Sequence, residues 1–238
     1  MAIANGLHWL GAPFIFIASI LFLISTLSAP VWDHIGLLNV HLTNGSTVSF
    51  GTFGYCILND GPFGHTADYC SATSIGYAPA HVVAAADYTR LTDIETGTSD
   101  SFTRAMILHP IISALTFFAW LTALGAGLFG SLIGLALAGI AHMLCVTVLG
   151  TDFTLFGILR HHINSDWSGS HATFGDGIWC LVAGFVLLFW GWLLVGLTCL
   201  RNRTEEQRSE RPRTAGSGST ATPLPPPPLG RRKKYGLF

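Results

Sequence analysis

The chain has 238 residues, of which 50% are hydrophobic and only 11% are charged, and its formal net charge is −1. An average soluble domain carries roughly 25% charged residues, so the composition excludes an ordinary soluble domain and predicts a membrane protein. We expect membrane lipids as a partner and no nucleic acid.

Charged residues are absent from three long segments, 1–32, 105–151 and 177–200. A helix needs about 20 apolar residues to cross the hydrocarbon core of a bilayer. The first and third segments therefore hold one span each, and the middle one is long enough for two. We predict four spans, at about 8–30, 105–126, 129–150 and 177–200. For the first segment a cleaved signal peptide is the alternative.

The basic residues predict the orientation. Nine of the twelve Lys and Arg residues follow residue 200, whereas the two loops, 31–104 and 151–176, hold ten of the thirteen acidic residues. Basic flanking segments stay in the cytosol. We therefore expect both termini to be cytosolic, both loops to lie outside and the protein to be a multi-pass protein of the plasma membrane.

The first loop opens with a β-hairpin pattern. Hydrophobic residues alternate with polar ones on both sides of Asn44-Gly45. Asn-Gly favours a two-residue type I′ turn, in which both central residues have positive φ. The same residues begin the sequon Asn44-Gly45-Ser46, which predicts N-glycosylation at Asn44 on the outer face. Farther along, residues 81–90 are rich in alanine and predict a short helix.

Two cysteines of the first loop, Cys56 and Cys70, lie among glycine and aromatic residues. A pair this close in an external loop suggests a small β unit held by a disulfide, since the outside of the cell is oxidising. Two unpaired thiols are the alternative. A third cysteine, Cys199, ends the last span and is a candidate for palmitoylation or else an ordinary membrane thiol.

The spans contain two other features of interest. Gly130, Gly134 and Ala138 recur every four residues at the start of the third span, a pattern that allows close helix approach in lipid. It serves either packing within the bundle or self-association. His109 and His142 are the ionisable side chains expected within the spans, so they are candidates for a response to pH, with packing against a neighbouring helix as the alternative.

The second loop and the tail carry weaker signals. His161, His162 and His171 with Asp166 have no spacing diagnostic of a metal, so we predict no metal site. Residues 201–238 have the composition of a disordered cytosolic tail. Its proline run at 223–228 would bind an SH3-type domain or act as a spacer, and its basic cluster at 231–234 would bind anionic lipid.

No catalytic constellation is apparent. The sequence has no glycine-rich phosphate loop, no paired carboxylates within a span and no Cys-x-x-Cys motif. We therefore expect neither enzymatic activity nor a cofactor. Charged residues inside membranes usually mark ion or substrate pathways, and their absence from the predicted spans argues against a transporter.

The first loop also carries a family motif. Trp32 precedes Gly51-Thr52-Phe53-Gly54-Tyr55-Cys56, Cys70 and Ile75-Gly76-Tyr77. The arrangement resembles the claudin-like signature, with Phe53 where that signature has a second tryptophan. The flanks of the cysteines are similar to the fungal Sur/PalI family of plasma-membrane proteins, over residues 1 to about 200. This resemblance implies an all-α membrane protein, a four-transmembrane-helix bundle with a small extracellular β unit bonded by Cys56–Cys70.

The resemblance also implies a function. Similarity to PalI implies a non-enzymatic accessory role in ambient-pH signalling, in which the protein helps to localise or stabilise a multi-span pH sensor. The Sur branch implies a structural component of cortical membrane domains and wall organisation. A claudin-like adhesion or channel-forming protein is the third alternative.

Overall fold

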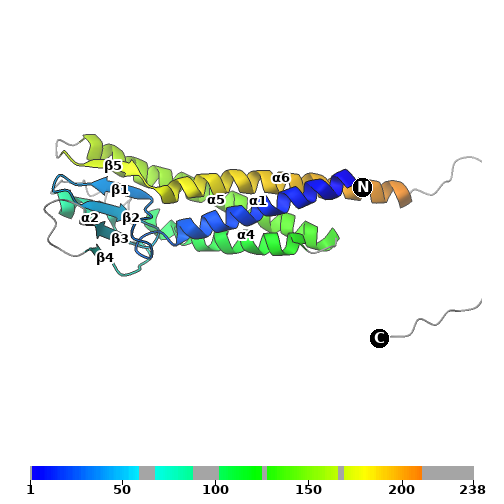
Figure 1. Cartoon of the computed structure of the whole chain (residues 1–238), viewed down its shortest axis with the longest axis horizontal. Coiled ribbons are helices and arrows are strands. Elements are labelled where there is room, and N and C mark those ends of the chain that lie inside the picture. The colour runs from blue at the N-terminus through cyan, green and yellow to red at the C-terminus, as the bar shows by residue number, and fades with distance from the viewer. Residues whose placement is uncertain (1, 59–67, 88–101, 125–127, 166–168, 211–238) are drawn as a thin grey trace, which may run out of the picture.

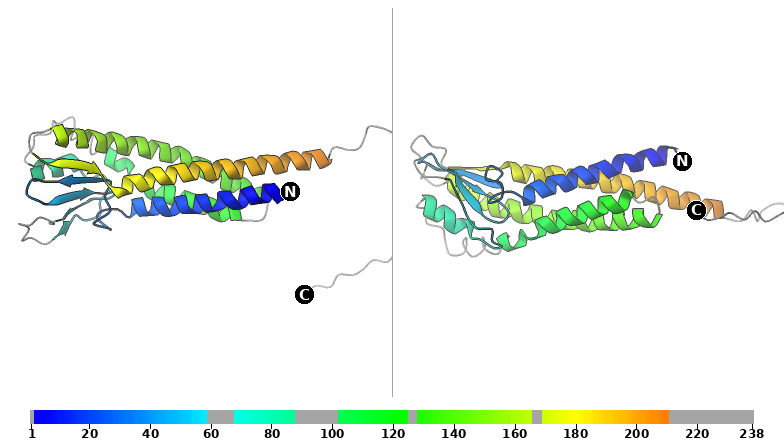
Figure 2. Two further views of the ribbon diagram at one scale, coloured as in Figure 1. Left: turned by 45° about the horizontal axis from the view of Figure 1, so that its top comes forward. Right: turned by 60° about the horizontal axis from the view of Figure 1, so that its bottom comes forward.

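Long helices run side by side and carry a small sheet at one end (Figures 1 and 2). The computed structural model describes residues 2–58, 68–87, 102–124, 128–165 and 169–210, with the backbone alone for some of them, 2–9 above all. The helices are α1 (Ala2–Thr26), α2 (Pro79–Asp87), α4 (Leu108–Leu124), α5 (Leu128–Ser165) and α6 (Asp176–Glu210). The strands are β1 (Leu38–His41), β2 (Thr47–Phe50), β3 (Tyr55–Leu58), β4 (Tyr69–Cys70) and β5 (His171–Phe174).

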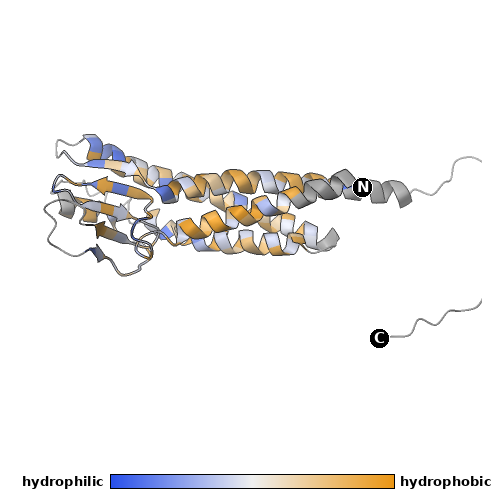
Figure 3. Cartoon of the chain, in the orientation of Figure 1, coloured by the Kyte–Doolittle hydropathy of each residue, from blue (hydrophilic) through white to orange (hydrophobic). Residues whose placement is uncertain are grey.

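The bundle consists of α1, α4, α5 and α6. Helix α1 packs along α6 and α4, and α5 packs along α4 and α6. Hydrophobic residues cover the helices, whereas hydrophilic ones gather at the sheet end (Figure 3). In the described part of the chain three helical segments are long and apolar enough to cross a membrane, Phe102–Leu124, Gly130–Ser165 and Asp176–Arg201, and Leu10–Thr26 is a shorter apolar helix. The protein is therefore a membrane protein with at least three such helices.

The sheet is antiparallel throughout, with the strand order β4-β3-β2-β1-β5. Alternation in β1 and β2 turns Leu38, Val40, Val48 and Phe50 toward one buried core. Strand β5 comes from the segment between α5 and α6 and pairs with β1, with Leu38 opposite Phe174. This pairing joins the two predicted loops into one structural unit.

The turn of the first hairpin differs from the predicted type. The Gly45 amide donates to the Leu42 carbonyl at 3.0 Å, so Thr43 and Asn44 occupy the centre of the turn. Gly45 follows with φ 87°. A turn followed by a glycine at positive φ is the usual three-residue hairpin loop. The register of His41 with Thr47 leaves too many residues between the strands for the predicted two-residue I′ turn.

Two predicted boundaries also shift. Helix α5 continues to Ser165, through most of the segment expected to be the second external loop from residue 151. Helix α6 continues to Glu210, past the expected start of the tail at residue 201. Neither extension contains proline, and Gly157 is the glycine that they contain, so no strong helix-breaking signal interrupts them. The proline run and basic cluster of the tail lie outside the described residues.

The extension of α5 supports the edge of the sheet. The Asn164 side chain donates to the Ala172 carbonyl at 3.1 Å and accepts from the Ala172 amide at 2.8 Å. The Arg160 guanidinium lies 5.1 Å from the centre of the Phe174 ring, a cation–π contact. The backbone amide and carbonyl of Ala172 are thus hydrogen-bonded at a strand edge that would otherwise be open.

Candidate functional site

The sheet and the bundle have separate hydrophobic cores that meet at one level of the molecule. Met106, just before α4, belongs to the sheet core, and Ile112 of α4 belongs to the bundle core. On α5, Leu155 belongs to the sheet core and Val148 to the bundle core. The residues that make polar or close backbone contacts between these cores form the region that we call the junction. Its residues are Ser25, Ser28, Gly51, Thr52, Tyr77, Thr103, His109 and Asp152.

His109 and Asp152 form a buried pair in the junction. The His109 Nε2 atom lies 3.1 Å from the Asp152 Oδ2 atom, and the two side chains are 0% and 2% exposed. The other ring nitrogen, Nδ1, lies 3.1 Å from the Met106 carbonyl oxygen. Because a carbonyl oxygen only accepts hydrogen bonds, Nδ1 carries a proton. The Nε2–Oδ2 contact is an ion pair by distance, since neither atom has a well-oriented hydrogen-bond partner in the described structure. The contact is attractive when the pair holds one further proton, as imidazolium with carboxylate or as imidazole with carboxylic acid.

Tyr77 connects the motif of the first loop to this pair. Its hydroxyl donates to the Gly51 carbonyl at 2.7 Å, and the Thr103 hydroxyl donates to the Tyr77 carbonyl at 2.6 Å. Burial raises the pKa of Tyr77 above its ordinary value, and the nearby negative charge of Asp152 raises it further. The phenol therefore stays protonated and keeps its donor role.

Hydrogen bonds that involve hydroxyl groups join the end of α1 to the sheet unit. The Thr52 hydroxyl donates to the Ser25 carbonyl at 2.9 Å, and the Thr52 amide donates to the Ser28 hydroxyl at 3.0 Å. Next to them Gly51 packs directly on the backbone of Ala29, where a side chain at position 51 would collide with the Ala29 carbonyl oxygen. The structure thus gives a reason for glycine in the motif.

The other motif residues surround the junction or face outward. Cys56 and Cys70 lie opposite each other on β3 and β4 and form a disulfide. The Tyr55 ring packs against those of Phe50, Tyr69 and Tyr77. Three further motif positions lie in the loops beside the sheet. The Phe53 carbonyl accepts a backbone hydrogen bond, and Gly54 lies against Pro30. Gly76 has φ 77° and lies beside Arg104. Trp32 and Ile75 are 44% and 58% exposed.

The predicted helix-packing residues lie within the bundle. A Cβ atom at Gly134 would lie 2.9 Å from the Ala119 carbonyl oxygen of α4, and Ala138 is fully buried. This contact favours packing within the chain over self-association for Gly134. Gly130 lies in the first turn of the same helix and is partly exposed. Cys199 is 5% exposed, and this burial favours the ordinary thiol over palmitoylation.

The other candidate residues are separate from the junction. Asn44 is exposed at the hairpin turn, where its side-chain oxygen accepts from the Ser46 amide at 2.9 Å. His142 lies between α5 and α6, with its ring 4.6 Å from that of Phe185. Of the predicted histidine group, His161, His162 and His171 are described and Asp166 is not. No group of three or more metal-ligating side chains occurs among the described residues.

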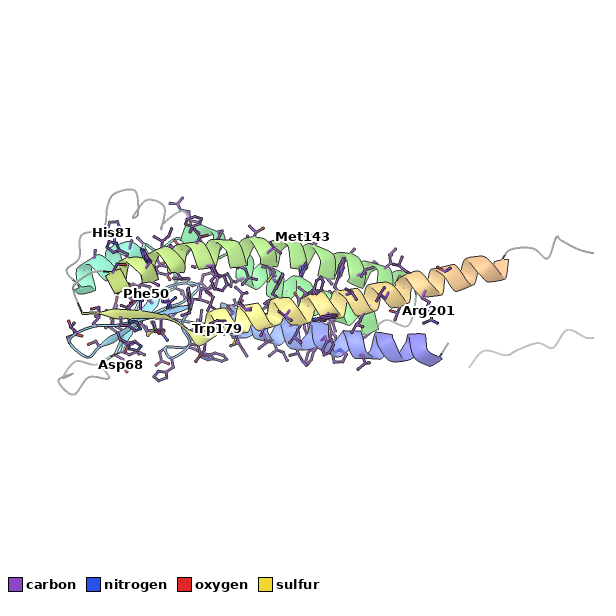
Figure 4. The ribbon with its side chains drawn as sticks, turned by 90° about the horizontal axis from the view of Figure 1, so that it is seen from above. Phe50, Asp68, His81, Met143, Trp179 and Arg201 are labelled. Carbon is purple, nitrogen blue, oxygen red and sulfur yellow. A yellow bond between two sulfur atoms is a disulfide. The ribbon has the colours of Figure 1, made fainter. Side chains whose placement is uncertain are left out.

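The sequence analysis missed two features of the site. It assigned Asp152 to a loop because the predicted span ended at residue 150, so the pairing with His109 was not expected. It also missed β5 and the contacts of Asn164 and Arg160 with it. Figure 4 shows the resulting order along the molecule, with Phe50 in the sheet unit, Trp179 near the junction and Arg201 at the far end. The helix periodicity of residues 148–159 could have indicated that α5 continues through Asp152.

The architecture defines a membrane protein in which an apolar helix bundle carries a disulfide-bonded sheet. A family model described as the SUR7/PalI family matches residues 7–191, which include the bundle, the sheet and the junction. The chain belongs to the SUR7/PalI family. No curated protein matches it.

Proposed function

We propose that this protein is a non-enzymatic accessory protein of the plasma membrane that helps to localise or stabilise a multi-span sensor in ambient-pH signalling. The observation that carries the proposal is the membership of the SUR7/PalI family over the whole bundle and sheet. The hydrogen bonds of the junction support it, because through them a change in the sheet would reach the helices, the part of the chain that a partner in the membrane would contact.

We infer that the chain crosses the membrane four times, with the sheet outside and both termini in the cytosol. Helix α1 has 25 residues, which at about 1.5 Å per residue are about 37 Å long, enough for the roughly 30 Å hydrocarbon core. The start of α1 and the end of α6 lie together at the end opposite the sheet (Figure 1). Arg201 lies at that end, as expected for the cytosolic side.

The membrane surface of the bundle is the region that we assign to the partner. Large hydrophobic side chains such as Ile133, Ile140 and Met143 of α5 are half exposed or more and face outward. Helix association in lipid depends on close packing rather than on the hydrophobic effect. A multi-span partner would therefore recognise the shape of this surface, whereas the tail would add general contacts with lipid or an SH3-type domain.

Co-purification from mild detergent tests the proposal. The full chain and a version ending after Glu210 are isolated at matched expression from cells grown at neutral and at alkaline pH. We expect both to retain the same multi-span partner, and loss of the protein to impair growth under alkaline conditions only. If the shortened chain loses the partner, the tail is the interaction module.

The Sur branch of the family favours a second candidate, a structural component of cortical membrane domains. Such a component would form stable patches in every growth condition and would not need an alkaline signal. Fluorescence imaging at both pH values therefore separates the two candidates. Conductance of the purified protein in a bilayer would instead indicate the third alternative, a channel.

A further inference from the structure

We propose that the His109–Asp152 pair is a proton-controlled lock that holds the sheet docked on the bundle. While the pair holds its shared proton the junction is closed, and loss of that proton loosens the contact between the two cores. The inference rests on the proposed function only for its biological use, since it would make the accessory protein itself responsive to alkaline surroundings. Its test needs no partner.

The pair lies at the level where the sheet core meets the bundle core. His109 lies on α4 between Met106 of the sheet core and Ile112 of the bundle core, and Asp152 lies between Val148 and Leu155 on α5. Any movement that rehydrates the pair must separate α4 from α5 at this level. The two side chains are almost completely buried, so water cannot compensate a charge there unless the junction opens.

The net charge of the His109–Asp152 pair explains why alkaline pH should loosen the junction. With the shared proton present, the pair has no net charge in either of its two forms. When this proton leaves, the Asp152 carboxylate faces a neutral imidazole, and a negative charge remains uncompensated in an apolar site. A buried charge that loses its partner strongly destabilises a fold. Alkaline conditions should therefore favour opening.

Two further groups among the described residues act on Asp152, and neither is a cation. Tyr77 of the first loop and Cys145 of α5 interact electrostatically with Asp152, and both are neutral in their protonated forms. At the start of α6 two titratable groups, Asp176 and Cys180, interact with each other. The segment Leu10–Thr26 of α1 contains no titratable side chain. Arg104, near the start of α4, is exposed and lies against Gly76.

His142 offers a matched control within the same helix bundle. It is also a histidine of the membrane helices, but its ring stacks on Phe185 and lies 6.3 Å from the Trp192 ring. No carboxylate faces it among its described contacts. Replacing His142 therefore removes a membrane histidine without touching the junction.

The experiment follows thermal unfolding of the full chain in detergent between about pH 5 and 9, the range in which histidine chemistry acts. For the natural chain we expect the Tm to fall toward alkaline pH. Asp152→Asn keeps a neutral donor beside Nε2, so its Tm should stay level on the alkaline side and fall toward acid. His109→Gln leaves the carboxylate unpaired, so its Tm should be lower by roughly 10 °C at neutral pH and recover toward acid.

The double variant His109→Gln/Asp152→Asn and the control His142→Gln complete the set. The double variant should have little pH dependence, and His142→Gln should keep the alkaline loss of the natural chain. If His109→Gln does not fold, the pH dependence of Tm in Asp152→Asn, compared with that of the natural chain, still tests the proposal. An alkaline loss that is the same in Asp152→Asn as in the natural chain, or that disappears in His142→Gln, overturns the proposal. Failure of the co-purification would refute the accessory role and leave these profiles unchanged.

Discussion

The sheet end and the membrane end of this molecule are stabilised in different ways. The sheet end combines a disulfide and strand pairing with buried hydrogen bonds such as that from Thr52 to Ser25. At the membrane end, side-chain hydrogen bonds such as that from Thr116 to Ile112 stay within one helix, and the helices meet through close contacts at small residues, for example Gly191 beside Ile15. Water drives burial at the sheet end, whereas lipid leaves packing as the main force between helices. Substitutions should therefore weaken each region through a different mechanism.

The largest effect is expected where the two regions meet, for Gly51→Ala. A methyl group at this position would collide with the Ala29 backbone, and Thr52 cannot shift freely because it bonds to Ser25 and Ser28. We expect a loss of about 3 kcal/mol or more in the free energy of unfolding. Gly157→Ala is the control, since nothing lies within 4 Å of a Cβ atom there. Equal stability of the two variants in detergent denaturation would show that the junction yields easily.

Removing the disulfide should weaken the sheet end alone. Cys56 and Cys70 are separated by 14 positions, and closing a loop of this size stabilises a fold by about 3 kcal/mol in the chain-entropy description. In Cys56→Ser/Cys70→Ser we expect earlier proteolysis of the sheet unit, with the bundle helices still protected. Cys180→Ser serves as the control. Peptide mapping without reductant that finds both natural thiols free would contradict the pairing.

Local patterns predicted the parts of this structure that depend on neighbouring residues. The alternation around Asn44-Gly45 indicated the hairpin, and the motif around Cys56 and Cys70 indicated the bonded strands. The turn type was wrong because it depends on the register of β1 with β2. The pairing of His109 with Asp152 and the addition of β5 to β1 could not be predicted, because each joins segments far apart in the chain.

A smaller effect is expected at the membrane end, for Gly134→Ala. The added methyl group would lie 2.9 Å from the Ala119 carbonyl oxygen and 3.1 Å from the Ala123 amide of α4, so the helices must separate slightly. Gly150 of the same helix has open space around it, and Gly150→Ala should gain up to about 1 kcal/mol in helix propensity. We expect Gly134→Ala to be the less stable variant by about 2 kcal/mol.

The comparison of Gly134→Ala with Gly150→Ala also affects how experiments on partner binding should be designed. Because Gly134 faces α4, a bulky residue there would damage the bundle itself, and a lost partner would not identify a binding surface. Thermal unfolding of both alanine variants in the same detergent checks the order. A Gly134→Ala chain as stable as Gly150→Ala would mean that the stripe is free for contact with another protein.

The smallest effect is expected for Tyr77→Phe, which removes one hydrogen bond between the two regions. The Gly51 carbonyl loses its partner at 2.7 Å, and the stacked ring contact with Phe50 remains. We expect a loss of about 1 kcal/mol at neutral pH. Because burial raises the pKa of Tyr77 in the folded chain, only the unfolded chain ionises once the pH exceeds about 10, the ordinary tyrosine value. Stability then falls with rising pH in the natural chain.

Tyr77→Phe lacks this ionisation, so the stability difference between it and the natural chain should shrink above that pH and then reverse. Chemical denaturation near pH 8 measures the effect of the lost hydrogen bond, and denaturation near pH 11 measures the added effect of tyrosine ionisation. Tyr69→Phe is the control, because Tyr69 is 56% exposed at the sheet edge and contributes no bond to the junction. A stability difference that stays constant across this pH range would mean that Tyr77 ionises in the folded chain as readily as in the unfolded one. Tyr77 would then be open to water at the level where the sheet end meets the membrane end.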